Sequence, residues 1–119
     1  MELLISHLKG QLAQPLPGKQ AQLKMATLRR IEELEMRGVP PADARVAAVM
    51  ILIHRLPGED WKTVLIERAA HPKDRHSGQI SFPGGSWEDS DGSLEAVALR
   101  EAHEEIGIPP AQIQVLGRL

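Results

Sequence analysis

Residues 84–108 read GGSWEDSDGSLEAVALREAHEEIGI and form the most informative part of this 119-residue chain. Apolar residues recur through the second half of this stretch at helical spacing, which predicts a helix over residues 93–106. Gly107 and two prolines end that helix, and a short apolar run leads into the two glycines that open the stretch. A glycine pair lets the backbone approach a ligand or a helix closely, although an ordinary turn would use glycines as well.

Three glutamates near the end of this helix, Glu101, Glu104 and Glu105, are spaced i, i+3 and i+4. Their carboxylates therefore leave one turn together and suit a hard divalent cation, Mg²⁺ or Mn²⁺. On a helical wheel Glu101 and Glu105 share an arc with apolar residues, and an ionised carboxylate near apolar surface needs a compensating charge. A solvated helix held by i, i+4 pairs such as Arg100–Glu104 is the simpler alternative. The wheel position favours the metal site, and with it chemistry on a phosphate anhydride.

Composition limits the partners of the chain. The formal net charge of −2 provides no basic surface for nucleic acid or an anionic membrane, so an anionic substrate would need a metal ion or a few arginines. The lack of cysteine excludes disulfides and thiolate metal sites and favours an intracellular location. The apolar N-terminal stretch carries charges and no cleavage signal, so it predicts neither a signal peptide nor a membrane span. We expect a soluble, cytoplasmic protein that acts on a small molecule.

The rest of the chain predicts a mixed α/β domain that follows a helical N-terminal segment. Helices are expected over residues 2–14 and from Met25 to Leu34 and beyond, up to Gly38. Apolar runs predict strands, the first two joined as a hairpin, at residues 45–56, 61–68, 79–82 and 113–119. The expected division is a helical N-terminal segment at residues 1–43 and an α/β (α+β) domain at residues 44–119.

The opening stretch resembles the Nudix box, G-x5-E-x7-R-E-U-x-E-E-x-G-U, in which U is a bulky apolar residue. Gly85 opens the box, Asp91 stands for its first glutamate, and eight residues rather than seven then lead to Arg100. A second departure is Ala102 in the first apolar slot. Neither departure touches the three glutamates near the end of the helix, and the remaining box residues fall in register at Glu101, Glu104, Glu105, Gly107 and Ile108.

This resemblance implies a Nudix-type α/β/α sandwich with a mixed sheet and metal-dependent hydrolysis of a pyrophosphate linkage in a nucleoside diphosphate derivative. Family members usually continue with further strands and a helix, so the domain is expected to be incomplete at its C-terminus. Either the chain is a fragment, or it is a shortened protein whose exposed strand edges would favour a homodimer. Gly84 and Gly85 would shape the loop at the metal. The resemblance implies four catalytic residues, Arg100, Glu101, Glu104 and Glu105. It also implies that the three glutamates among them hold the metal.

The segment before the box is similar to that of the coenzyme A pyrophosphatase branch. It reads LIER from Leu65 and HSGQISFPGG from His76. The eight-residue spacer after Asp91 and the N-terminal PLPGKQAQLKMA also resemble that branch. One difference is Asp74, which stands where the branch usually has an arginine. The similarity implies cleavage of coenzyme A to 4′-phosphopantetheine and 3′,5′-ADP. Charged residues of the intervening loop are expected as phosphate contacts, or alternatively serve only solubility: Arg68, Arg75 and His76.

Two other functions stay open on the sequence. One is a pyrophosphatase for ADP-ribose or a nucleoside diphosphate sugar, and the other is a non-catalytic module that binds a nucleotide or a protein. Trp87 could stack on a base, and His103 is expected to face solvent. His54 and His71 lack the spacing of zinc ligands and receive no role.

Overall fold

The computed structural model describes residues 2–75 and 77–119. The chain forms two compact units, one comprising the chain up to Ala44 together with Gln114–Leu119 and the other comprising Arg45–Ile113. No described helix combines the length and apolar character needed to cross a lipid bilayer. The predicted α+β class is confirmed, because helices and small sheets both form.

The N-terminal unit contains three helices, α1 (Glu2–Leu12), α2 (Gly18–Leu23) and α3 (Leu28–Arg37), none of which has a buried residue. The helix expected from Met25 begins instead at Leu28. Thr27 sets that start, because its backbone is extended and its side chain accepts a hydrogen bond from the Arg30 N–H at 3.3 Å.

The described residues of the second unit form six short strands that pair two by two. The pairs are all antiparallel among the described residues, so the expected mixed sheet shows only antiparallel pairing there. The predicted hairpin forms at one of the three pairs, β2 with β3. The strands are β1 (Ala47–Val49), β2 (Ile53–His54), β3 (Lys62–Thr63), β4 (Ile66–Glu67), β5 (Ile80–Ser81) and β6 (Gly84–Ser86).

The long strands expected at residues 45–56 and 61–68 are each divided between two partners. The first half of the earlier strand joins β6, and this pairing extends beyond it, since the Met50 N–H donates to the Pro83 carbonyl at 2.7 Å and the Trp87 N–H donates to the Val46 carbonyl at 2.8 Å. β4 joins β5 in turn. The expected strand at residues 113–119 is wrong, because these residues are irregular and follow a short 3₁₀ turn at Pro110–Gln112.

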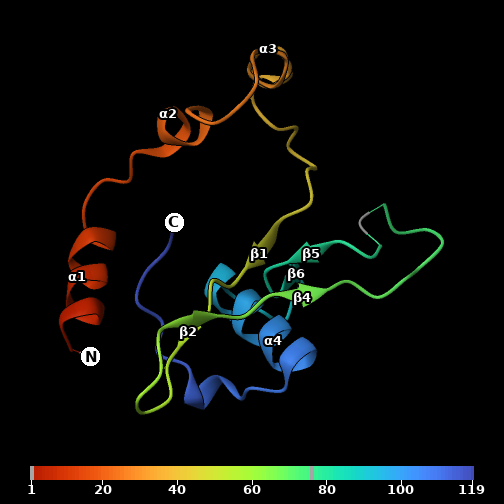
Figure 1. Cartoon of the computed structure of the whole chain (residues 1–119). Helices are drawn as coiled ribbons and strands as arrows, with labels where there is room; N and C mark the ends of the chain where they lie inside the picture. The colour runs from red at the N-terminus through yellow and green to blue at the C-terminus, as the bar shows by residue number, and fades with distance from the viewer. Residues whose placement is uncertain (1, 76) are drawn as a thin grey trace. The chain divides into compact units, whose positions relative to one another are not determined.

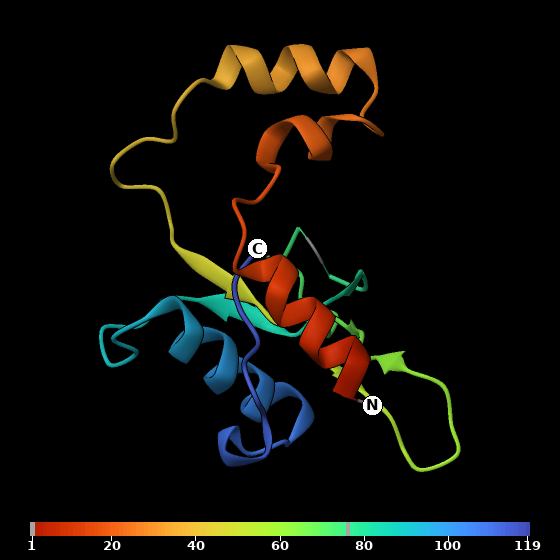
Figure 2. The same cartoon turned by 90° about the vertical axis from the view of Figure 1, so that its left-hand side faces the viewer.

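Helix α4 (Leu94–Ile106) packs against β1 and β6 and supplies the core of this unit, as Figure 1 and the side view of Figure 2 show. Its buried residues are Val97, Ala98 and Ala102, and Pro83 is fully buried as well. The small alanines allow the helix to lie close to the glycine-containing strand β6. Removal of a Val97-sized side chain from water contributes roughly 1.5–3 kcal/mol.

Candidate functional site

The two glycines of the box lie in strand β6, where they were expected in a loop, and they allow α4 to approach closely. A Cβ atom at Gly85 would collide with the Glu101 carboxylate, and a Cβ at Gly84 would overlap the Ala48 carbonyl and Val49. Gly84 therefore requires glycine, because a side chain there would overlap backbone atoms, whereas a side chain at Gly85 would displace the Glu101 carboxylate from its position. The close approach expected of the pair is present, and the ordinary-turn alternative does not apply.

Two of the three box glutamates turn toward this strand. The Gly84 N–H donates to Glu105 Oε1 at 3.1 Å, and the Glu101 carboxylate lies against Gly85, with 17% of its side chain exposed. Their common direction agrees with the helical wheel, which placed both on the arc that faces the sheet.

Glu104 is the most loosely held of the three glutamates, although it shares Arg100 Nη1 with Glu101. Its side chain is 57% exposed, and its Oε2 lies 3.4 Å from Arg100 Nη1 in the i, i+4 pair of a solvated helix. Among residues 2–75 and 77–119, no three acidic or histidine side chains are grouped closely enough to hold a metal ion. His103 is exposed, as expected.

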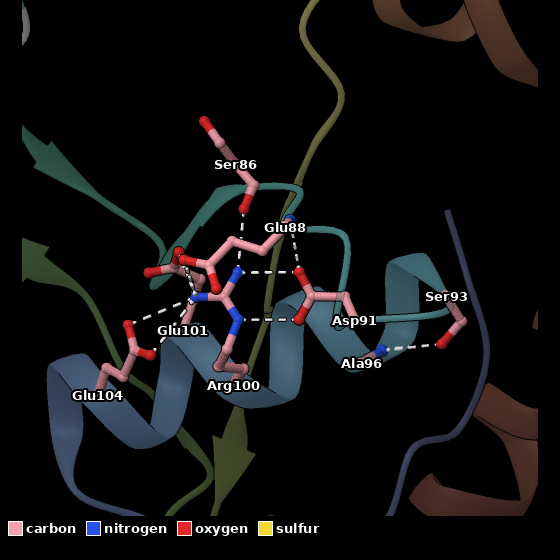
Figure 3. A network of polar contacts seen from close by, with 8 residues as sticks. All are labelled: Ser86, Glu88, Asp91, Ser93, Ala96, Arg100, Glu101 and Glu104. Atoms are coloured by element: carbon pink, nitrogen blue, oxygen red, sulfur yellow. Dashed lines mark hydrogen bonds and ion pairs between the residues drawn. The ribbon is translucent and has the colours of Figure 1, made fainter.

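Arg100 is the centre of the polar network shown in Figure 3. Its Nε and Nη2 donate to the two oxygens of Asp91 at 2.8 and 3.0 Å, and Asp91 is only 3% exposed. Nη2 also donates to the Ser86 carbonyl at 3.0 Å, and Nη1 donates to Glu101 Oε1 at 2.9 Å. One guanidinium thus joins the loop after β6, the strand itself and the box glutamates.

The paired charges of this network shift one another's pKa values. The hydrogen bond from Arg100 lowers the pKa of Asp91, against the opposing effect of burial, and the Glu88 N–H, which donates to Asp91 Oδ2 at 2.8 Å, lowers it further. The hydrogen bond to Asp91, followed by that to Glu101, raises the pKa of Arg100. Both groups are therefore ionised at neutral pH. In the sequence Asp91 stands for the first box glutamate and could contribute a metal ligand or a contact to a bound water; in the structure both of its oxygens accept hydrogen bonds from Arg100.

A cleft of about 690 Å³ adjoins the box glutamates. One part of its lining comes from β6, the following loop and α4, and includes Glu88, Glu101 and Glu105. The other part comes from β4 and the loop after it, and includes Glu67, Arg68, Ala69, His71 and Asp74. The cleft lies between the β4 segment and the β6–α4 segment, and the sequence alone did not predict that these two segments lie side by side.

Only some of the residues predicted to contact phosphate line this cleft. Arg68 lines it, but its guanidinium is paired with Asp74, with Nη2 and Oδ2 3.2 Å apart. Its backbone also closes the loop, because it donates to the Gln79 carbonyl and accepts from the Gly78 N–H. Gly84 and Gly85 line the cleft, Arg75 is exposed and outside the described lining, and His76 lies outside the described residues.

Two features escaped the sequence reasoning. His71, which received no role, lines the cleft that holds the box glutamates. Trp87 lies with Arg45, Val46 and Ser86 around a second, shallow hollow of about 310 Å³. Only the strand pairings reveal either placement, so no local pattern could have found them.

Comparison with known proteins gives one family. The family model of the NUDIX domain matches residues 44–119. The chain is 46% identical over 79 residues to an uncharacterized Nudix hydrolase NudL of Shigella flexneri serotype 5b, with 66% of this chain and 40% of that protein covered. It is 42% identical over 80 residues to the protein of that name in Klebsiella aerogenes, with 67% and 64% covered. The Escherichia coli O1:K1 protein of that name is 47% identical over 75 residues, with 63% and 38% covered.

The chain thus spans less than two thirds of the length of each of these relatives. No solved structure matches it.

Proposed function

The chain belongs to the Nudix family, and we propose on this basis that it acts in metal-dependent hydrolysis of a pyrophosphate linkage in a nucleoside diphosphate derivative. One observation carries the proposal: Glu101 and Glu105 of the box line a cleft of about 690 Å³ beside the glycine pair. A cleft of this size accommodates a small-molecule ligand.

Nudix hydrolases generally use divalent metal ions. The donor set of this chain fits such an ion, because all three box side chains offer carboxylate oxygens, the ligands that Mg²⁺ and Mn²⁺ prefer. Glu101, Glu104 and Glu105 would hold it, and when bound it would neutralise the diphosphate and acidify a water.

The protein's own residues prepare the site in this proposal. Asp91 holds the Arg100 guanidinium, and Arg100 orients Glu101 through the 2.9 Å hydrogen bond. The Gly84 N–H orients Glu105 in the same way. Arg68, held by Asp74, would meet the phosphates at the other part of the cleft.

Coenzyme A is the substrate that we propose first. The LIER and HSGQISFPGG segments before the box support it; they contain β4, β5 and the first two residues of β6. The products would be 4′-phosphopantetheine and 3′,5′-ADP. Other nucleoside diphosphate derivatives, ADP-ribose first among them, are the alternatives within the same reaction.

A non-catalytic binding module is a second candidate. One observation favours it: Arg100 Nη1 lies near both Glu101 and Glu104, so that two of the three metal-binding carboxylates already have a cationic partner. A metal-dependent enzyme must free these carboxylates from Arg100 to bind its metal, whereas a binding module can leave them paired.

Product analysis separates these candidates. The chain is incubated with coenzyme A, ADP-ribose or NADH and Mg²⁺ or Mn²⁺, and the products are identified by chromatography and mass spectrometry. We expect cleavage of coenzyme A, abolished by EDTA and restored by excess Mg²⁺. Binding of these compounds by a folded chain without any product would contradict hydrolysis and support the module.

A further inference from the structure

We propose that His71 is a substrate-binding residue of this site, whose Nε2–H donates to a phosphate oxygen of the diphosphate. The inference rests on the proposed function for the identity of the ligand. It adds a group from outside the box to a cleft whose described lining is dominated by carboxylates.

Two contacts fix the position of His71 in the loop after β4. Its backbone N–H donates to Ser77 Oγ at 2.9 Å, which ties the residue across the loop. Its ring Nδ1 accepts a hydrogen bond from the Lys73 N–H at 3.2 Å. Both the backbone and the ring are therefore held, and little side-chain freedom is lost when a ligand binds.

The Lys73 contact also decides which ring nitrogen carries the proton. A backbone N–H can only donate, so Nδ1 must accept, and the neutral ring then has its proton on Nε2. The nitrogen left for a ligand is thus a donor. A phosphate oxygen is an acceptor, so the two are complementary.

The negative charges around the cleft make a hydrogen-bond donor useful for binding a diphosphate. Glu67, Glu88, Glu101 and Glu105 all repel a diphosphate, and the guanidinium of Arg68 is already shared with Asp74. His71 also lines the cleft, and unlike Arg68 it can donate to an anion without first breaking an ion pair. A donor at this place lowers the cost of bringing phosphate oxygens among carboxylates.

Two substitutions separate ligand binding from loop structure. In His71→Asn the side-chain oxygen can take the place of Nδ1 and accept from the Lys73 N–H, but no donor reaches the position of Nε2. In His71→Gln the longer amide can place its NH₂ near Nε2. A purely structural histidine is replaced better by Asn, and a ligand donor is replaced better by Gln. His54→Asn, an exposed position on β2 outside the cleft lining, is the matched control.

The binding experiment uses α,β-methylene-ADP, a diphosphate that hydrolysis at the bridge cannot consume, with Mg²⁺ and isothermal titration calorimetry on the whole chain. We expect His71→Asn to raise Kd about tenfold or more, as for loss of a hydrogen bond to a charged group, and His71→Gln and His54→Asn to stay within about threefold of the unsubstituted chain. Retention of affinity by His71→Asn would overturn the inference.

A measurement without any substitution covers the case in which a variant fails to fold. Long-range ¹H–¹⁵N NMR on the unsubstituted chain should show the Nε2 signal of His71 shifting as α,β-methylene-ADP is added, while that of His54 stays in place. An unmoved His71 signal at saturation would refute the contact.

The failure of this inference can be told from the failure of the proposed function. Binding of the analogue that depends on His71, without turnover of any diphosphate, would remove the hydrolase and leave the contact. Turnover with unimpaired binding by His71→Asn would remove the contact and leave the hydrolase. No binding of the analogue by the folded chain would overturn the contact whatever the turnover.

Discussion

Arg100 and Asp91 determine the arrangement of the box at the scale of single residues. Asp91 is shorter than the glutamate usual at its box position and lies one residue further from the arginine, yet it accepts both guanidinium hydrogen bonds while nearly buried. Gly92, directly after Asp91, has φ 75°, a left-handed conformation that glycine adopts readily. An aspartate at this box position therefore still holds the guanidinium through two hydrogen bonds.

The Arg100–Asp91 pair predicts a pH dependence of stability. Since the pKa of Asp91 is lowered in the folded chain, its contribution is present above the unfolded value of about 4 and is lost as pH falls through the lowered pKa. Urea titrations from pH 7 to pH 2.5 should show a loss of stability below about pH 4 that is smaller in Asp91→Asn. An identical acid slope in both proteins would refute the role of this pair.

Gly85 predicts a steric effect. An added methyl group would displace the Glu101 carboxylate, so Gly85→Ala should impair turnover. Because that carboxylate ends a flexible side chain, the free energy of unfolding should fall by only about 1 kcal/mol, the low end of the cost of overpacking. Gly10→Ala is the control, because nothing lies within 4 Å of a Cβ built there in α1. A Gly85→Ala variant with unimpaired turnover would show that turnover does not need the Glu101 carboxylate in its place against Gly85.

At the scale of elements, α4 could be predicted from the sequence because its ends are local features. Ser93 caps it through a 3.0 Å hydrogen bond from the Ala96 N–H, and Gly107 ends it in the left-handed conformation, at the ends the pattern indicated. The strands could not be predicted as well, since their bounds depend on partners far along the chain. β6 forms only because Ala47–Val49 pairs with Gly84–Ser86, and no local pattern expresses that pairing.

The cap at Ser93 predicts a further effect on stability. Ser93→Ala removes the acceptor for the Ala96 N–H and should cost about 1 kcal/mol, whereas Ser93→Asp should keep most of the cap. Thermal unfolding followed by circular dichroism would measure both. Equal losses in the two variants would mean that this hydrogen bond does not stabilise α4.

At the scale of the whole molecule, the box residues fall into two groups that the sequence presented as one. Glu101 and Glu105 line the cleft, while Glu104 is outside its described lining and pairs with Arg100, as Glu101 also does. Helical spacing predicted the shared face of the first two correctly, but the competition of Arg100 for Glu104 depends on where Asp91 holds the guanidinium. The predicted homodimer and the predicted division at residues 43 and 44 stay predictions.

Substitution of Glu104 tests the central claim, metal-dependent hydrolysis by the box, most directly. Turnover of the best substrate with Mg²⁺ is measured for the unsubstituted chain, Glu104→Gln and Glu95→Gln. Glu95 is an exposed glutamate of the same helix that is not one of the three box glutamates. An exposed i, i+4 pair is worth only about 0.3–0.5 kcal/mol, so both variants should fold. The account predicts that Glu104→Gln abolishes turnover and that Glu95→Gln retains it; unchanged turnover in folded Glu104→Gln would contradict it.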